Sequence, residues 1–127
     1  MTTGHILLVD HHNENYRQIH FLLNLCGFRF VAARTICEAE NWLNSLQHEA
    51  NRFDLMLINT VKNKEDLNVL FSVAQQITGG IAVLLVERQW TQEDVLKEVS
   101  ITQNVQFSSC SPEDVTCQLH QMLGRND

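Results

Sequence analysis

Runs of apolar residues alternate along the chain with segments whose apolar positions recur every three or four residues. The apolar runs show little polar alternation, which is typical of parallel strands covered on both faces. Strands are therefore predicted at residues 5–10, 28–33, 53–59, 81–86 and 105–109. A segment with helical spacing follows each strand. Five strand–helix units in succession predict one α/β domain with a parallel sheet and right-handed crossovers.

Residues at the ends of the predicted helices support the same division of the chain. Gly27 follows the apolar stripe of the first helix, at a position where helices commonly end. Thr35 and Glu38 have the spacing of a capping box at the start of the second helix. Ser111 and Pro112 start the last helix, with a capping hydroxyl and a proline in the first turn. The helices thus have defined starts and stops.

The composition is that of one folded domain, residues 1–127, with its core at about 4–124. Of the 127 residues, 44% are hydrophobic, which is enough for a single packed core. The 15 acidic and 9 basic residues give a formal net charge of −6, which argues against nucleic-acid binding. No apolar run approaches the ~20 residues that cross a bilayer, and residues 1–5 do not resemble a secretion signal. We therefore expect a cytoplasmic protein without a membrane partner.

The four cysteines do not have the spacing of a disulfide framework or a metal site. Cys26, Cys37, Cys110 and Cys117 lie far apart, and no C-x-x-C pair occurs. Cysteines of a cytosolic chain are mostly reduced and behave as small hydrophobic residues. We therefore expect free, buried thiols.

Polar residues gather where the predicted strands end. In parallel α/β sheets, ligands bind at the carboxyl ends of the strands, near the point where the strand order reverses. The candidate pocket residues at these ends are Asp10, His11, Asn59, Glu87 and Ser108.

With these strand ends, the chain resembles the receiver domain of two-component response regulators, of the chemotaxis-regulator type. Four local matches support the resemblance over about residues 4–124: ILLVD at 6–10, CGF at 26–28, FDL at 53–55 and SPEDV at 111–115. The resemblance implies a flavodoxin-like three-layer α/β/α fold, a (βα)5 unit with strand order 2-1-3-4-5. It also implies phosphoryl transfer from a histidine kinase to an aspartate, assisted by Mg²⁺.

The chain departs from this family at nearly every position that carries its chemistry. Asp10 fits the first acid of the family's acidic pair, but His11 stands at the second. Asn59 stands at the phosphoacceptor position, and an amide is neither a nucleophile nor a charged metal ligand. Glu87 stands at the switch hydroxyl and Ser108 at the lysine. The resemblance therefore implies a degenerate pseudo-receiver.

We expect this pseudo-receiver to be a signalling module without enzymatic activity or cofactor, and to bind Mg²⁺ weakly or not at all. It would act by protein–protein contact with a histidine kinase, an output domain or another regulator; a homodimer is also open. The candidate interaction surface contains Trp90, Val105 and Phe107, of which Val105 falls at the family's aromatic switch position. Trp90 is either a cap over the pocket or an anchor for a partner.

Other interpretations remain open at this stage. Asn59 either hydrogen-bonds Asp10, closing a pocket without an ion, or bonds a backbone amide. Glu87 either pairs with a neighbouring cation or stands in for the charge of a phosphoryl group. The pocket around His11, Asn59 and Glu87 could instead sense a ligand or metal, although a closed metal site needs three or four converging ligands. The remaining alternative is a working phosphoacceptor at Asp10 or Asp66.

Overall fold

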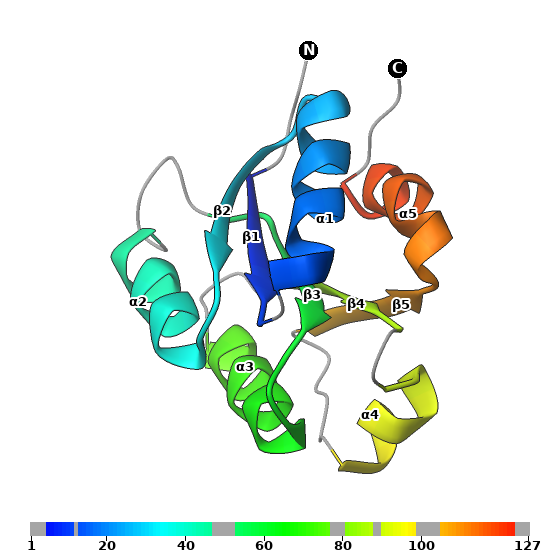
Figure 1. The fold of residues 1–127 in the computed structure, drawn as a ribbon. Coiled ribbons are helices and arrows are strands. Elements are labelled where there is room, and N and C mark those ends of the chain that lie inside the picture. Colours follow the sequence, from blue (N-terminus) through cyan, green and yellow to red (C-terminus); the bar gives the residue numbers. More distant parts are fainter. Residues whose placement is uncertain are drawn as a thin grey trace.

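One parallel sheet of five strands forms the centre of the computed structural model, in the order β2-β1-β3-β4-β5 (Figure 1). The strands are β1 (His5–Asp10), β2 (Arg29–Ala33), β3 (Leu55–Thr60), β4 (Ile81–Val86) and β5 (Val105–Cys110). Helices cover both faces of the sheet, so the predicted flavodoxin-like α/β/α fold is confirmed. The structure describes residues 5–11, 13–46, 53–76, 81–87, 90–98 and 105–123.

The predicted strand boundaries are correct for β1 and β4 and differ by one or two residues in the other strands. β2 begins one residue late because the N–H of Phe28 still bonds the carbonyl of Leu23 in the preceding helix, at 3.0 Å. β3 begins at Leu55 because Asp54 is engaged with the start of β1. The carboxylate of Asp54 accepts the His5 N–H at 2.9 Å, and its own N–H donates to the His5 carbonyl at 2.8 Å. β5 ends one residue later than predicted.

The helices are α1 (Asn13–Leu25), α2 (Ile36–Leu46), α3 (Lys64–Gln76), α4 (Gln92–Glu98) and α5 (Val115–Met122). The Thr35 hydroxyl accepts the Glu38 N–H at 3.2 Å, which confirms the predicted cap of α2. Gly27 follows α1 with φ 80°, a left-handed conformation that glycine adopts without a Cβ clash. In the part of the chain that is described, no helix combines the length and apolar character needed to span a membrane.

The start of α5 differs from the prediction. The Ser111 side chain makes no capping bond, and its hydroxyl instead donates to the carboxylate of Asp114 at 3.0 Å. An ionised carboxylate is a stronger acceptor than a neutral oxygen, and the Asp114 N–H is already bonded to the Ser111 carbonyl at 3.0 Å. A 3₁₀ turn, η1 (Pro112–Asp114), therefore precedes the α-helix.

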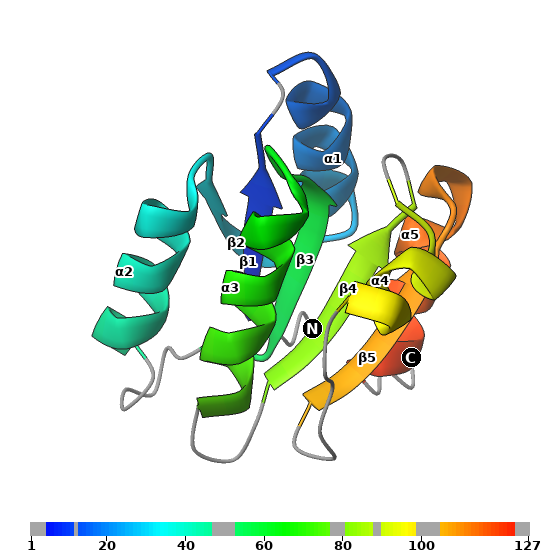
Figure 2. The ribbon, with the colours of Figure 1, turned by 90° about the horizontal axis from the view of Figure 1, so that it is seen from below.

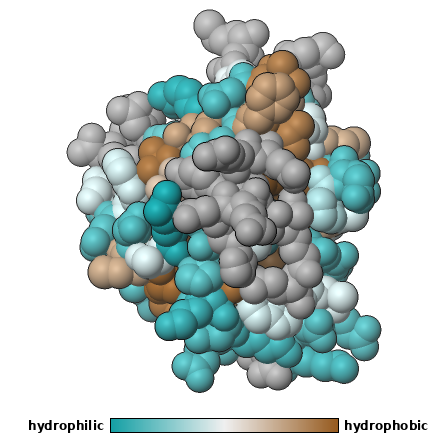
Figure 3. Space-filling view, in the orientation of Figure 1, coloured by the Kyte–Doolittle hydropathy of each residue, from teal (hydrophilic) through white to brown (hydrophobic). Residues whose placement is uncertain are grey.

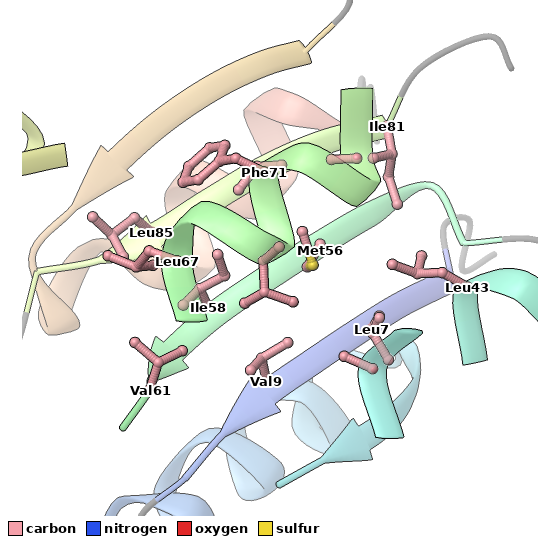
Figure 4. Close-up of a cluster of buried hydrophobic side chains, with 14 of the residues drawn as sticks. Leu7, Val9, Leu43, Met56, Ile58, Val61, Leu67, Phe71, Ile81 and Leu85 are labelled. Carbon is pink, nitrogen blue, oxygen red and sulfur yellow. The ribbon is translucent and has the colours of Figure 1, made fainter. Parts of the chain in front are cut away.

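Two apolar clusters fill the space between the sheet and its helices. On one face, α2, α3 and α4 pack over inward-pointing residues such as Leu7, Met56 and Leu85 (Figures 2 and 4). On the other face, α1 and α5 pack over Leu8 and Leu57. Every residue of β1 and β3 is buried, which agrees with strands that are apolar on both faces.

The four cysteines all lie within the described residues and are free thiols, as predicted. Their predicted burial is right only for Cys110: Cys26 is half-buried, and Cys37 and Cys117 are exposed. Each step along an α-helix turns by about 100°, so a cysteine one residue from the apolar stripe can face solvent. Cys37, which directly follows Ile36, is such a case.

Candidate functional site

A β-bulge brings two consecutive side chains of β3 to the end of β1. The pairing of β1 with β3 shifts between Val9 and Asp10: Val9 lies opposite Ile58, whereas Asp10 lies opposite Thr60. Consecutive residues of a regular strand point to opposite faces. A bulge adds an unpaired residue, here Asn59, and redirects the local side chains. This irregularity explains how the side chains of Asn59 and Thr60 both reach the carboxylate of Asp10.

The carboxylate of Asp10 is buried, with 1% of its residue surface exposed, and lies in a polar network. The Asn59 amide Nδ2 donates to one of its oxygens at 3.2 Å. The Thr60 hydroxyl donates to the other at 2.5 Å. That hydroxyl in turn accepts the backbone N–H of His11 at 2.8 Å. Such bonds offset part of the cost of keeping a charge away from water.

The network confirms one of the two expected contacts of Asn59, the hydrogen bond to Asp10. His11 joins through its backbone, and its residue is exposed rather than turned into the pocket. Thr60 was missed as a site residue because the third strand was predicted to end at Asn59. An available signal was the polar pair Asn59–Thr60 at the end of an otherwise apolar run.

His20 of α1 is a titratable group close enough to Asp10 for the charge of Asp10 to affect its pKa. Its ring is half-buried and meets the ring of Phe30 edge-to-face, with centroids 4.8 Å apart. Burial lowers the pKa of His20, and the negative charge of Asp10 opposes this in part by raising it. The net effect is a pKa below the usual histidine value, so the neutral ring is favoured in the folded state.

This lowered pKa predicts a loss of stability in mild acid. Below about pH 6.5, the histidine value in an unfolded chain, the unfolded state binds a proton that the folded state resists. The free energy of unfolding therefore falls as the pH drops from 7.5 to 5.5. In urea titrations, His20→Gln should flatten this dependence. Equal slopes for wild type and His20→Gln would contradict the assignment.

Glu87 follows β4 and faces the start of α4. Its carboxylate accepts the backbone N–H of Gln92 at 2.8 Å and lies 3.1 Å from the hydroxyl of Ser109. Neither role predicted for Glu87, pairing with a cation or standing in for the charge of a phosphoryl group, includes these contacts. Ser108 and Ser109 both lie in β5, paired with Leu84 and Leu85, and Ser109 makes the contact with Glu87. Consecutive side chains of a strand point to opposite faces, so Ser108 does not share this position. The sequence did not reveal Ser109 as the partner of Glu87.

The candidate interaction residues Trp90 and Phe107 are both partly buried and pack against the apolar cluster under α3. The ring of Phe107 meets that of Phe71 edge-to-face at 5.3 Å. This packing places Trp90 against the hydrophobic core, a contact that neither expectation for Trp90 named. The backbone of Val105 belongs to β5, and its side chain lies outside the described part of the chain.

Other hydrophobic side chains are more exposed than these. Phe21 and Leu25 on α1 are 65% and 70% exposed, and Leu96 on α4 is 53% exposed. Phe21 and Leu25 are four residues apart and therefore share one side of the helix. Hydrophobic surface is visible over the C-terminal half of α1 (Figure 3). Phe21 and Leu25 do not belong to the helically spaced apolar positions from which α1 was predicted. Their place outside this stripe is a sequence signal that their side chains are exposed.

The described residues contain no group of three or more His, Cys, Asp or Glu side chains that could hold a metal ion. Asp66, the alternative phosphoacceptor, lies in the first turn of α3 and is half-buried. Its backbone N–H donates to the side-chain oxygen of Asn63 at 3.0 Å, which caps that helix.

In comparisons with known proteins, no family model and no curated protein sequence matches this chain.

Proposed function

We propose that this chain is a receiver-like signal-transduction module of the two-component type that acts by protein–protein contact and is not phosphorylated at Asn59. The observation that carries the proposal is the state of Asp10. One of its carboxylate oxygens accepts the Asn59 amide and the other accepts the Thr60 hydroxyl. A side-chain network thus lies where a receiver-like sheet concentrates its acids.

This network opposes the chemistry of a working receiver. Mg²⁺ takes oxygen ligands in near-octahedral geometry and is usually held by one or two carboxylates. To ligate an ion, Asp10 would have to exchange buried hydrogen bonds from Asn59 and Thr60 for contacts with the metal. Asn59 contributes no negative charge and has no nucleophilic oxygen. Because the Asp10 carboxylate is already hydrogen-bonded, we expect it to bind Mg²⁺ weakly. Because Asn59 has no nucleophilic oxygen, we expect no aspartyl phosphate at position 59.

Exposed apolar side chains support a role in protein contacts. Phe21 and Leu25 of α1 and Leu96 of α4 each expose more than half of their surface. Large apolar residues at the surface are favoured where proteins associate. The partners proposed are a histidine kinase, an output domain or another regulator, in the cytoplasm.

The test is to incubate the chain with acetyl phosphate and Mg²⁺, and separately with beryllofluoride and Mg²⁺. Intact mass and backbone amide NMR are recorded beside an ordinary receiver domain as the positive control. We expect no phosphoryl adduct, and no shift of the Asp10, Asn59 and Thr60 amides in low millimolar Mg²⁺. A mass gain of one phosphoryl group would falsify the proposal.

The same NMR samples test the sensor interpretation. Zn²⁺ or Ni²⁺ is added to the chain in separate titrations, and the imidazole signals of its histidines are followed. The proposed contact module predicts no saturable shift of the His11 signals. A saturable shift of His11 together with the Asn59 and Glu87 amides would instead assign the strand-end residues to a metal sensor.

A further inference from the structure

Three elements meet at a polar junction beside the strand ends. Glu87 lies at the end of β4, and its backbone N–H donates to the carbonyl of Cys110 in β5 at 2.8 Å. Its side chain accepts the first N–H of α4, that of Gln92, at 2.8 Å. The same carboxylate oxygen lies 3.1 Å from the hydroxyl of Ser109 in β5. One residue therefore connects β4, β5 and α4.

The helix held at this junction is short. α4 has seven residues, and isolated helices shorter than about 12 residues are marginal in water. Val95 is its buried apolar residue, with 1% exposed, and Leu96 faces solvent. The exposed Glu93–Lys97 ion pair adds little, because both side chains are solvated. Among the described residues, Val95 is thus the one buried apolar anchor of α4.

Reciprocal capping supplies a further contact at the start of α4. The Thr91 hydroxyl accepts the Asp94 N–H at 3.2 Å, and the Asp94 carboxylate accepts the Thr91 N–H at 3.0 Å. The bond from the Thr91 N–H to the Asp94 carboxylate lowers the pKa of Asp94, and the Thr91 side chain adds to this effect. The two capping bonds order the first turn internally but do not attach it to the sheet. Two side chains link this end of α4 to β5. The Glu87 carboxylate reaches both the helix backbone and Ser109, and the side-chain oxygen of Gln92 lies 3.1 Å from the same Ser109 hydroxyl.

We propose that Glu87 is a latch that holds the N-terminus of α4 against the end of β5 in one fixed position. The charge of the carboxylate strengthens its bond to the helix N–H. Ser109 has a second acceptor at the same distance, since its hydroxyl also lies 3.1 Å from the side-chain oxygen of Gln92. A hydroxyl has one proton and donates to one acceptor at a time. Ser109 therefore supports the latch, and Glu87 holds it.

The latch extends the proposed function without depending on it. A fixed α4 presents Leu96 and its neighbours in one arrangement, with no phosphoryl group needed to set it. The contacts of Glu87 with Gln92 and Ser109 are present without any added metal or ligand. The experiment therefore measures the hydrogen exchange of the α4 amides and does not depend on the function of the chain.

Hydrogen exchange of the full chain tests the latch with three variants: Glu87→Ala, Glu87→Gln and Ser109→Ala. Loss of a hydrogen bond to a charged group should speed exchange of the α4 amides by about tenfold or more in Glu87→Ala. Glu87→Gln keeps an acceptor oxygen, so its α4 amides should stay within about threefold of wild type, as should those of Ser109→Ala. The amides of β1 and β3 serve as the internal reference.

Two results would overturn the latch. In the first, the α4 amides of Glu87→Ala exchange within about twofold of wild type, a change below the worth of one hydrogen bond. In the second, the amides of β1 and β3 accelerate as much as those of α4, which would make Glu87 a general stabiliser of the fold. The NMR signal of the Leu96 methyl groups gives an independent measurement, because a displaced α4 changes their surroundings.

Discussion

Asn59→Asp is expected to lower the free energy of unfolding by about 2–4 kcal/mol at pH 7, because it places a second carboxylate against a buried one. The amide nitrogen that is replaced lies 3.2 Å from the Asp10 carboxylate. Two carboxylates at this distance resist joint ionisation, so the pair retains a proton in the folded state. Keeping an ordinary carboxyl protonated at pH 7 costs about 4 kcal/mol, which sets the upper limit.

The pH dependence of this variant has a definite sign. The shared proton raises a carboxyl pKa in the folded state above its unfolded value of about 3.9. The folded state then binds more protons than the unfolded state, so stability falls as the pH rises from about 4 toward the raised pKa. Urea unfolding at several pH values should therefore show the variant approaching wild type near pH 4. Asn59→Leu is the matched control, because it removes the Asn59 amide without adding a charge.

The effect of Mg²⁺ on stability is a second property that should distinguish Asn59→Asp from wild type. A cation that binds the new acid pair in the folded state stabilises it by mass action, by about 1.4 kcal/mol at ten times the dissociation constant. We expect Mg²⁺ to raise the unfolding midpoint of Asn59→Asp and to leave wild type and Asn59→Leu unchanged. If Asn59→Asp is as stable as wild type at pH 7 without Mg²⁺, the buried contact between Asp10 and Asn59 is contradicted.

The fold could be predicted because apolar runs and helix caps are local signals. The β4 strand is wholly apolar and β1 is apolar between His5 and Asp10, and the predicted ends of both strands agree with the structure. The ends of β3 depend on its partner strand. Asp54 is held by the backbone of His5, 49 residues away, and the bulge at Asn59 arises from pairing with β1. No local pattern encodes contacts of that separation.

The candidate site could be predicted in position but only partly in its contacts. Parallel strands end at one edge of the sheet, so Asp10 and Asn59 were expected to be neighbours, and they are hydrogen-bonded. Thr60 entered the network through the bulge, which the sequence did not indicate. Glu87 turns toward α4 because an unpaired helix N–H lies within its reach, at 2.8 Å. Side-chain direction at a strand end is set by such competing partners.

Thr60→Val is expected to cost about 2–3 kcal/mol of folding free energy, the worth of a buried hydrogen bond to a charged group. Valine has nearly the shape of threonine, so the substitution removes the donor to Asp10 and leaves the packing in place. The carboxylate then keeps its bond from Asn59 but loses the Thr60 hydroxyl. The His11 N–H loses the hydroxyl as an acceptor and keeps the Thr60 carbonyl, at 3.1 Å. The loss is therefore concentrated on Asp10.

Thr60→Ser is the matched control, since it keeps the hydroxyl and removes one methyl group, worth about 0.8 kcal/mol when buried. Urea unfolding of the two variants, with equal m-values, should place valine well below serine in stability. Equal losses would mean that packing rather than the hydrogen bond stabilises this position. Because Asn59 and Thr60 share the Asp10 carboxylate, Asn59→Leu combined with Thr60→Val should depart from additivity. Such coupling is the expected property of a carboxylate held by its neighbouring side chains.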